Sequence, residues 1–343
     1  MPLKANQKER YSRMLALRDF TEDDMEKILT SRVTVVGAGG LGSAVLHLLT
    51  ALGFGHIRII DRDIVELSNI QRQTVYDTSD IGMPKAEAAA ANLKVMNPEV
   101  DLEPISASLD ERNAHELLVG SDIIIDGLDS FHTRHAVNKV SQSLEIPYVF
   151  AGAIEYHSNL TTFIPGQTGC LHCMAGDAKD DPEYTCANVG VTPELLSIAG
   201  AIQVREAVLL TTEREPHLKS RLMVVDLSSL TFDVFDIGRD EDCPVCSVAQ
   251  PDVPIRVSKE ASATTLCSGT FSIAPPSMNV LDIDGIAARL DDRYDVKKAA
   301  KWLKIKTLEG TEITIMGRGN AIVRGVSSVE DALAIYREVV GLE

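Results

Sequence analysis

The chain has 343 residues, of which 45% are hydrophobic and 24% are charged, and this composition predicts a globular protein of about two domains. Its formal net charge is −17, and nearly all of that charge lies in residues 1–250, because residues 251–343 hold 13 acidic and 12 basic side chains. An acidic first part argues against nucleic acid and anionic membranes as partners, although local cations and backbone N–H groups can still hold a nucleotide. No apolar run is long enough for a transmembrane helix, and the N-terminus lacks the apolar core of a signal peptide, so we expect a cytoplasmic protein.

The first half of the chain predicts a parallel sheet. A β-branched run at 32–37 is followed by a helical pattern at 42–52 and by a second strand at 56–61, which together form a βαβ unit. A long helix is expected after Thr192, because threonine is a good cap and Pro193 suits the first helical position. The other expected elements are polar helical segments at 6–30, a helix at 85–95 begun by Pro84, strands at 121–126 and 147–151, and the long helix itself to residue 210.

The pattern changes after a Pro-containing linker at 249–257. A Glu309-Gly310 turn between two strand-like runs indicates a hairpin, and Ser328 is the expected cap of a closing helix. The elements expected here are strands at 264–273, 302–308 and 311–326 and helices at 283–290 and 327–340. We therefore expect a first domain at 1–248 and a small α+β domain at 258–343.

A glycine-rich turn joins the first strand to the first helix of the sheet. Gly37, Gly39 and Gly42 have the spacing of a nucleotide-binding turn, and Gly40 lies between them. The glycines permit a tight turn and close approach of the backbone, and the helix N-terminus offers N–H groups to phosphate. Asp61 ends the second strand about 20 residues later, where an acid binds ribose hydroxyls. Taken alone, this pattern predicts a dinucleotide site and a dehydrogenase, and a turn without a ligand is the less specific alternative.

The polar residues beyond the second strand do not fit a dehydrogenase. Asn69, Arg72 and Gln73 follow it closely, and the guanidinium of Arg72 suits phosphate oxygens. Lys85 begins a helix, where a cation is unfavourable unless an anion lies nearby. Asp129 follows a buried strand at the carboxyl edge of the sheet and suits Mg²⁺ held against phosphates. Each residue alone is compatible with a solvated surface group, but their placement at one sheet edge predicts a phosphate site.

Two Cys-x-x-Cys pairs supply a complete ligand set for zinc. Cys170 and Cys173 form the first pair, and Cys243 and Cys246 form the second. Because all four ligands are thiolates, we expect a closed, structural site, with His172 as a neighbour rather than a ligand. The predicted fold class is therefore α/β: a Rossmann-like, mostly parallel sheet with flanking helices and a four-cysteine zinc knuckle, plus a small C-terminal α+β domain.

Two cysteines remain outside these pairs. From spacing alone, Cys186 and Cys267 are best interpreted as small buried thiols, which is the common fate of a free cysteine in an intracellular chain. A relay thiol is the alternative for Cys267.

Together these motifs resemble the E1-like adenylating enzymes of the MoeB/ThiF/HesA family, which activate ubiquitin-fold sulfur carriers and related small modifiers. The resemblance covers about residues 8–248, with the motifs in family order and spacing. The matching segments are Arg10-Tyr-Ser-Arg13, 36–42, 61–73, Gly82-Met-Pro-Lys85, Asn97-Pro98, Asp126-Gly-Leu-Asp129, 185–190 and the two cysteine pairs.

The resemblance implies a reaction and its participants. In this family the carboxylate of a carrier ending in Gly-Gly attacks the α-phosphate of ATP, pyrophosphate leaves, and an acyl-adenylate forms. ATP, Mg²⁺, structural Zn²⁺, a small ubiquitin-fold partner and a homodimer are implied, with Arg13 resembling an arginine finger supplied across the dimer interface. The catalytic residues implied are Arg13, Arg72, Lys85, Asp129 and Cys186, and the nucleotide-binding residues are Gly37, Gly39, Gly40, Gly42, Asp61, Asp63, Asn69, Arg72, Gln73, Lys85 and Asp129.

Several alternatives stay open at this point. Cys186 falls where the family places a thiol that receives the carrier or handles sulfur, as a thioester or a persulfide. Residues 258–343 lie outside the family core, are too short for a typical rhodanese domain and do not end in Gly-Gly, so we expect a docking or regulatory domain. Adenylation of a small peptide or a tRNA base, an NAD-dependent oxidoreductase and a zinc-stabilised scaffold without turnover are the rival functions.

Overall fold

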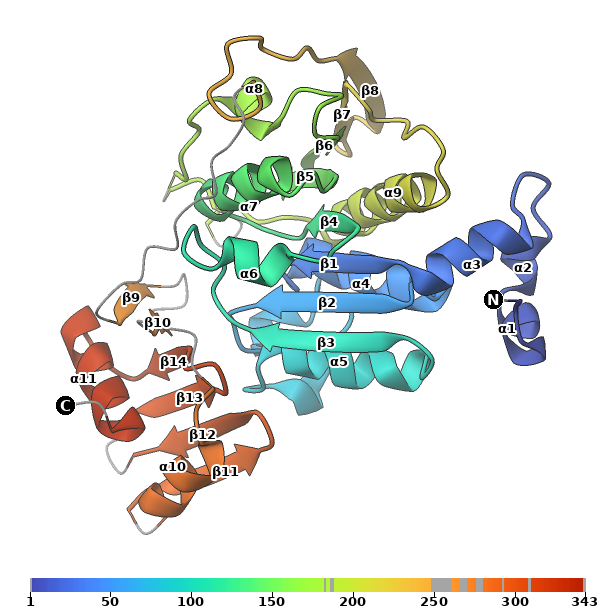
Figure 1. Cartoon of the computed structure of the whole chain (residues 1–343). Helices are drawn as coiled ribbons and strands as arrows, with labels where there is room; N and C mark the ends of the chain where they lie inside the picture. Colours follow the sequence, from blue (N-terminus) through green and yellow to red (C-terminus); the bar gives the residue numbers. More distant parts are fainter. Residues whose placement is uncertain are drawn as a thin grey trace.

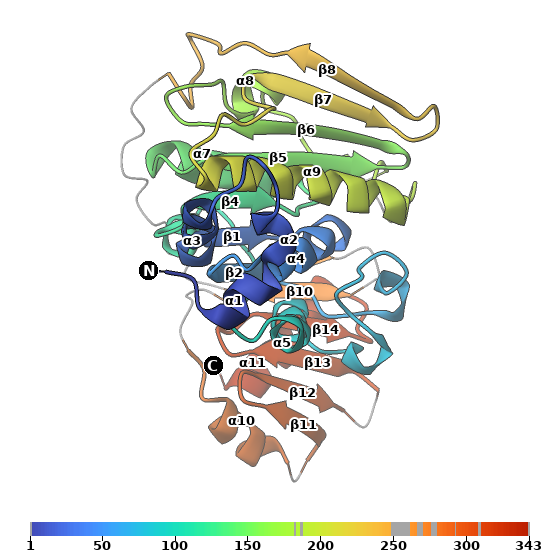
Figure 2. The same cartoon turned by 90° about the vertical axis from the view of Figure 1, so that its right-hand side faces the viewer.

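The computed structural model contains two β-sheets flanked by helices (Figures 1 and 2). It describes residues 2–181, 183–185, 188–247, 261–265, 270–275, 280–291, 293–307 and 310–341. The predicted linker at 249–257 lies outside these residues. None of the helices in these ranges is long and apolar enough to span a membrane.

The large sheet has eight strands in the order β3-β2-β1-β4-β5-β6-β7-β8. The first five strands in this order, β3, β2, β1, β4 and β5, are parallel to one another, and β6, β7 and β8 continue the sheet with antiparallel pairing. This arrangement confirms the predicted α/β class with a mostly parallel sheet. The strands are β1 (Arg32–Val36), β2 (His56–Asp61), β3 (Asp101–Ser106), β4 (Ile123–Asp126), β5 (Tyr148–Ile154), β6 (His157–Phe163), β7 (Arg221–Asp226) and β8 (Thr231–Asp236).

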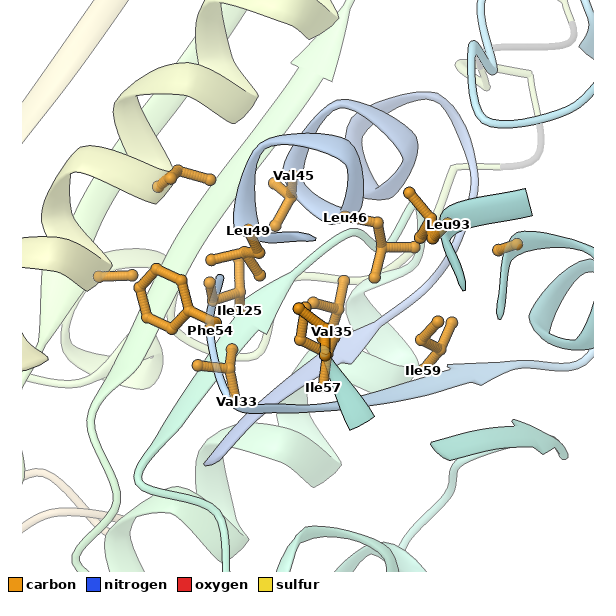
Figure 3. Packing of buried hydrophobic residues seen from close by; sticks show 14 of the residues in the cluster. Val33, Val35, Val45, Leu46, Leu49, Phe54, Ile57, Ile59, Leu93 and Ile125 are labelled. Atoms are coloured by element: carbon orange, nitrogen blue, oxygen red, sulfur yellow. The ribbon is translucent and has the colours of Figure 1, made fainter. Parts of the chain in front are cut away.

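Helices cover both faces of the parallel part, because its strands bury side chains on both sides. Val33 and Val35 pack on one face beneath α4, α5 and α9, as Figure 3 shows around α4, whereas Val36 packs on the other face against α6 and α7. The helices of this part are α1 (Ala5–Arg10), α2 (Ser12–Leu15), α3 (Glu22–Thr30), α4 (Gly40–Leu52), α5 (Lys85–Met96), α6 (Ala114–Leu118), α7 (Phe131–Ser143), α8 (Leu171–Ala175) and α9 (Pro193–Thr211), with two short 3-10 helices at Leu67–Asn69 and Thr78–Asp80.

The second sheet is antiparallel, with strand order β11-β12-β13-β14-β10-β9. Its strands are β9 (Ser262–Thr265), β10 (Phe271–Ala274), β11 (Asp295–Ala299), β12 (Trp302–Lys306), β13 (Glu312–Met316) and β14 (Ala321–Arg324), and its helices are α10 (Ile283–Leu290) and α11 (Val329–Val340). Both helices pack on one face of the sheet in a separate apolar core. Figure 1 shows this second unit beside the carboxyl ends of β2 and β3.

Several predicted elements are confirmed in the second unit, and two are wrong. The helix at 283–290 and the Ser328 cap are as expected, since the Ser328 hydroxyl accepts from the Asp331 N–H at 3.1 Å. The expected strand at 311–326 is two strands, β13 and β14, because Gly319 has φ of +91° and turns the chain back. The expected strand at 264–273 is likewise two antiparallel strands, β9 and β10.

The sequence patterns also missed elements of the large sheet. β3 contains Pro104, and a proline is tolerated there because β3 is an edge strand. Every residue of β8 is exposed. Neither strand therefore shows the alternation of buried and exposed residues that predicts a strand. The helical structure predicted at 6–30 is confirmed, and it consists of three helices, α1, α2 and α3. α9 begins as predicted, with Thr192 as its N-cap residue and Pro193 at its first position, but the Thr192 hydroxyl is buried without a hydrogen-bond partner among the described residues.

Candidate active site and metal centre

The glycine-rich turn between β1 and α4 packs tightly against the end of β4. Gly37 has φ of +94°, and a Cβ there would lie 2.4 Å from the carbonyl oxygen of Gly127. A Cβ on Gly42 would lie 1.9 Å from the carbonyl oxygen of Gly37. Neither separation is possible between non-bonded atoms, so only glycine fits at these positions. Packing within the chain therefore explains Gly37 and Gly42 without any ligand.

Gly39 is different, because the protein leaves space around it. It is the N-cap of α4, and the nearest atom to an added Cβ would be Nε2 of Gln73, 3.9 Å away. At Gly40 the close neighbour is only the flexible end of Leu196. A 13-residue helix begins here without a side-chain cap, so its first N–H groups are available to an acceptor. The turn thus combines an open approach with backbone donors, which suits a phosphate group.

Asp61 fastens this turn to the second strand. Its two carboxylate oxygens accept hydrogen bonds from the N–H groups of Ala38 and Asp63, each at 2.7 Å. The Tyr76 hydroxyl donates to the carbonyl oxygens of Ala38 and Lys85, at 2.8 and 3.2 Å, and so links the turn to the start of α5. Burial raises the pKa of Asp61, although the charge of Lys85 and the two N–H bonds lower it.

Lys85 is the first residue of α5, and its side chain is only 7% exposed. Its Nζ lies 3.4 Å from Oδ2 of Asp63, and its N–H donates to the Asp63 carbonyl at 2.9 Å. Burial lowers the pKa of Lys85, but the carboxylates of Asp63, Asp61 and Asp129 outweigh it and raise that pKa above its ordinary value. The lysine is therefore held in its charged form.

We call Asp61, Asp63, Lys85 and Asp129 the sheet-edge cluster. Asp63 forms an ion pair with the buried ammonium group of Lys85, and the charges of Asp61 and Asp129 also act on that group. Arg62 adds only a distant ion pair to Asp63 at 3.8 Å. One carboxylate oxygen of Asp63, Oδ1, is buried without a hydrogen-bond partner among the described residues. Such an excess of hard oxygen ligands suits Mg²⁺, which is bound by one or two carboxylates together with phosphate oxygens.

A buried network positions the loop that carries Asp129. The Arg134 guanidinium donates to Asp126 at 3.0 Å and to the Leu128 carbonyl at 2.7 Å, and the Tyr148 hydroxyl donates to the same Asp126 carboxylate. Burial raises the pKa of Asp126, although the charge of Arg134 lowers it. The network fixes the end of β4, while Asp129 itself stays exposed. The motif analysis did not identify Arg134, because it lies on α7 and carries no signal by spacing.

The segment between β2 and α5, residues 62–84, is named the crossover segment. Asn69 accepts from the Glu66 N–H at 3.0 Å, and Arg72 donates to the Ser68 carbonyl at 2.8 Å, so both side chains fold back onto the segment. Gln73 is buried beside Gly39, and its Oε1 has no partner among the described residues. Within those residues, none of the three hydrogen-bonds the sheet-edge cluster.

Arg13 lies far from this cluster within its own chain. It is exposed on α2, whose neighbour Tyr11 receives a hydrogen bond from Asn97 at 3.1 Å and packs against Gly53. Gly53 and Asn97 come shortly before β2 and β3 in the chain. Figure 1 shows α1 and α2 near the start of these strands, at the end of the sheet opposite the carboxyl ends that carry the cluster. Cys186 and Cys267, the two remaining predicted thiols, lie outside the described residues.

The four paired cysteines form a compact cluster. Their sulfur atoms lie within 4.8 Å of one another, with Cys170 and Cys243 3.7 Å apart and Cys173 and Cys246 3.5 Å apart. These separations exceed a disulfide bond of about 2 Å and match the roughly 3.8 Å expected between sulfurs around tetrahedral zinc. The donor set therefore fits a closed zinc site.

Neighbouring groups support this cysteine cluster. The Asn138 side chain donates to the Cys170 sulfur at 3.5 Å and accepts from the Leu171 N–H at 3.1 Å, which orients the first pair. His172 is not among the clustered ligand atoms, and its Nδ1 lies 3.6 Å from the Asp177 carboxylate.

Comparison with known proteins matches the ThiF family over residues 11–245. The chain is 38% identical over 247 residues to the SAMP-activating enzyme E1 of Haloferax volcanii, covering 72% of this chain and 91% of the relative. It is 30% identical over 348 residues to the sulfur carrier protein ThiS adenylyltransferase of Bacillus subtilis, covering 97% and 99%. The molybdopterin-synthase adenylyltransferase of Escherichia coli is 31% identical over 239 residues, covering 69% and 95%.

Solved structures agree on the fold. Escherichia coli MccB with ATP superposes with a TM-score of 0.59 and 23% identity, over 66% of this chain and 69% of that one. MccB with a succinimide gives 0.63 and 23%, over 72% and 75%. At this identity the likeness establishes the architecture of the large sheet and no more.

Proposed function

This chain belongs to the ThiF family of E1-like adenylating enzymes, and we propose that it adenylates the C-terminal carboxylate of a small ubiquitin-fold sulfur carrier ending in Gly-Gly. The adenylyltransferases to which it is similar support an ATP- and Mg²⁺-dependent reaction. They do not support the NAD-dependent oxidoreductase, which the glycine-rich turn and Asp61 alone left open.

One observation carries the proposal: the buried lysine and three carboxylates lie at the same sheet edge as the open helix N-terminus at Gly39. A dinucleotide site requires the glycine turn and one acid, so it does not explain why Lys85, Asp63 and Asp129 lie there as well. Phosphoryl chemistry uses all of them, because charge on the transferred and leaving phosphate oxygens needs a fixed cation and a metal-binding carboxylate.

The reaction transfers the adenylyl group to a carboxylate. A carrier carboxylate oxygen attacks the α-phosphorus of ATP, the bond from that phosphorus to the bridging oxygen breaks, and pyrophosphate leaves with the electron pair. Lys85 is the cation beside the phosphates, and Arg72 and Asn69 contact them from the crossover segment. Asp129, with Asp63, would hold Mg²⁺, which supplies charge neutralisation when bound. No protein nucleophile is required for this step.

Several finer assignments belong to the same proposal. The cysteine cluster holds zinc as a structural centre, Cys186 receives the activated carrier or handles its sulfur, and the protein acts in the cytoplasm without direct nucleic-acid contact. The two-domain division at 1–248 and 258–343 stays a prediction. Arg13 acts in the active site of a second copy within a homodimer, since α2, the helix that carries it, lies at the opposite end of the sheet in its own chain.

Intact mass spectrometry tests the substrate class. The protein is incubated with ATP, Mg²⁺ and each Gly-Gly-ending ubiquitin-fold protein of its organism. We expect one carrier to gain the mass of an adenylate, and the same carrier lacking its last glycine to gain nothing. Adenylation of a short peptide carboxylate, with every carrier unmodified, would contradict the carrier assignment and favour a peptide substrate.

Mixing two inactive variants tests the shared site. Arg13→Ala and Lys85→Met each remove one half of the proposed site, so the separate variants are inactive. After equilibration of subunits, half of the dimers contain one intact site, and activity returns to about a quarter of the wild-type value. Continued inactivity of a mixture shown to exchange subunits would contradict the role of Arg13.

A further inference from the structure

The second sheet presents two different faces to the rest of the molecule. Ile313, Ile315, Ala321 and Val323 on β13 and β14 point into the core beneath α10 and α11. Because side chains alternate along a strand, Met316 and Ile322 point to the opposite face, on which neither described helix of the second unit packs. Both side chains are nonetheless at most 2% exposed. Something outside the second unit therefore covers this face.

The cover is the crossover segment of the first unit. Ile64, which is 4% exposed, forms a small apolar cluster with Met316 and Ile322 and does not belong to either large core. Burying three such side chains against one another removes them from water and fixes the position of Ile64.

An ion pair extends the same contact along the segment. The Arg324 guanidinium donates to the Glu66 carboxylate, and the two side chains are 29% and 25% exposed. Arg324 lies two residues after Ile322 on β14, so it points to the same face. Partial burial and a fixed strand make this pair more effective than a fully exposed one. The second sheet thus holds the crossover segment at two nearby positions, Ile64 and Glu66.

Backbone hydrogen bonds connect this contact to the sheet-edge cluster. The ends of the crossover segment pair as a short ribbon, with Val65 N–H donating to Met83 at 2.8 Å and Lys85 N–H donating to Asp63 at 2.9 Å. Ile64 pairs with Pro84 in the same ribbon. Because Ile64 directly follows Asp63 in the chain, a shift of this ribbon also moves Asp63 and Lys85.

We propose that Arg324 and the Met316–Ile322 pair are positioning residues for adenylation: the second sheet holds the crossover segment so that Asp63 and Lys85, and the phosphate-binding Arg72, keep their catalytic places. This role rests on the proposed function. It assigns the second unit to the nucleotide site of its own chain rather than to carrier docking. Full-length similarity to the ThiS adenylyltransferase of Bacillus subtilis, over 97% of this chain, includes the second unit.

Charge reversal tests the positioning role in the full-length protein. Arg324→Glu places two carboxylates together and is expected to lower kcat for ATP–pyrophosphate exchange about tenfold, because small misplacements of catalytic groups are costly. The KM for the carrier and the thermal midpoint are expected to stay within twofold and within about 2 °C of wild type. Glu66→Arg combined with Arg324→Glu restores the opposite charges and is expected to restore kcat.

A second ion pair between the two units provides the matched control. Arg318 contacts Glu116 on α6 at 3.3 Å, and among the described residues it forms no ion pair with the crossover segment. Arg318→Glu is expected to leave kcat unchanged. An equal loss in Arg318→Glu and Arg324→Glu would overturn the proposal in favour of general docking of the units, and wild-type kcat in Arg324→Glu would overturn it outright.

Hydrogen exchange separates this proposal from the proposed function. Peptides covering 64–84 are expected to exchange faster in Arg324→Glu than in wild type and to recover in the double variant, whether or not any carrier is adenylated. A wild-type protein that catalyses no ATP–pyrophosphate exchange would refute the proposed function. Unchanged protection of 64–84 in Arg324→Glu would refute the positioning role independently.

Discussion

The sheet-edge cluster and the cysteine cluster are both groups of ionisable side chains, but they are built in opposite ways. At the sheet edge, three carboxylates surround one lysine, a buried oxygen of Asp63 has no hydrogen-bond partner among the described residues, and Gly39 leaves an open approach. In the cysteine cluster, four sulfurs lie within 4.8 Å of one another, at the spacing of a single metal ion. Unused binding capacity indicates a site that receives and releases ligands, whereas a closed donor set indicates a site that holds the fold. The comparison predicts that damage to the first costs rate and damage to the second costs stability.

The largest expected effect is on stability, from removing a cysteine. Cys173→Ser, or prolonged chelation of the wild-type protein, is expected to lower the free energy of unfolding by several kcal/mol, since structural zinc contributes roughly 10 kcal/mol or more in small zinc domains. Metal analysis should find one zinc per chain in wild type and none in the variant. Equal thermal midpoints with and without bound metal would show that the cysteine cluster does not hold the fold.

The next effect is on rate, from the exposed acid. Asp129→Ala is expected to lower ATP–pyrophosphate exchange about 10³-fold, because losing one group that stabilises transition-state charge typically costs 10²–10³. The thermal midpoint is expected to be unchanged, since Asp129 is exposed and the Asp126–Arg134 network holds its loop without it. A Mg²⁺ titration should show a raised requirement. A variant that unfolds at lower temperature with normal exchange would reverse the comparison.

Two glycines in one turn sharpen the contrast within the sheet edge. Gly39→Ala is expected to raise the KM for ATP about tenfold while leaving the fold intact, because its Cβ meets open space where a phosphate would lie. Gly42→Ala is the matched control, and it is expected to unfold the protein or abolish expression, because its Cβ would overlap the Gly37 carbonyl. Unchanged ATP affinity in Gly39→Ala would place the nucleotide elsewhere.

The smallest expected effect is on stability, and it concerns Asp24, a carboxylate that accepts hydrogen bonds from Thr21 and Arg214. Burial raises the pKa of Asp24, but hydrogen bonds from Thr21 and the nearby Arg214 guanidinium lower it below its ordinary value overall. Its stabilising contribution is therefore present above the unfolded pKa near 4 and is lost as the pH falls through the folded pKa. Asp24→Asn should cost about 1 kcal/mol at pH 7, with the difference from wild type vanishing on acidification in denaturant melts. A difference from wild type that does not change as the pH is lowered would contradict this assignment.

The sequence predicted the sheet edge better than it predicted the second unit, for a physical reason. Glycine turns, strand-ending acids and a helix-starting lysine are local features, so Gly37, Asp61 and Lys85 could be placed by pattern alone. The cysteine cluster joins residues 73 positions apart, but the two Cys-x-x-Cys pairs predict it because cysteine is a typical zinc ligand. Arg134 and the Ile64–Met316–Ile322 cluster depend on which surfaces meet in three dimensions, and no spacing encodes that. Exposed β8 and Pro-containing β3 lack the alternation on which strand prediction depends.

The most direct test of the central claim is ATP–pyrophosphate exchange with wild-type protein, Asp129→Ala and Cys173→Ser, with each Gly-Gly-ending carrier and with zinc content measured on the same samples. We predict carrier-dependent exchange in wild type, a loss of about 10³-fold in Asp129→Ala with full zinc occupancy, and loss of zinc and thermal stability in Cys173→Ser. Carrier-dependent exchange that persists in Asp129→Ala, or no exchange with any carrier from a zinc-loaded protein that binds ATP, would contradict the assignment of the sheet edge as the adenylation site.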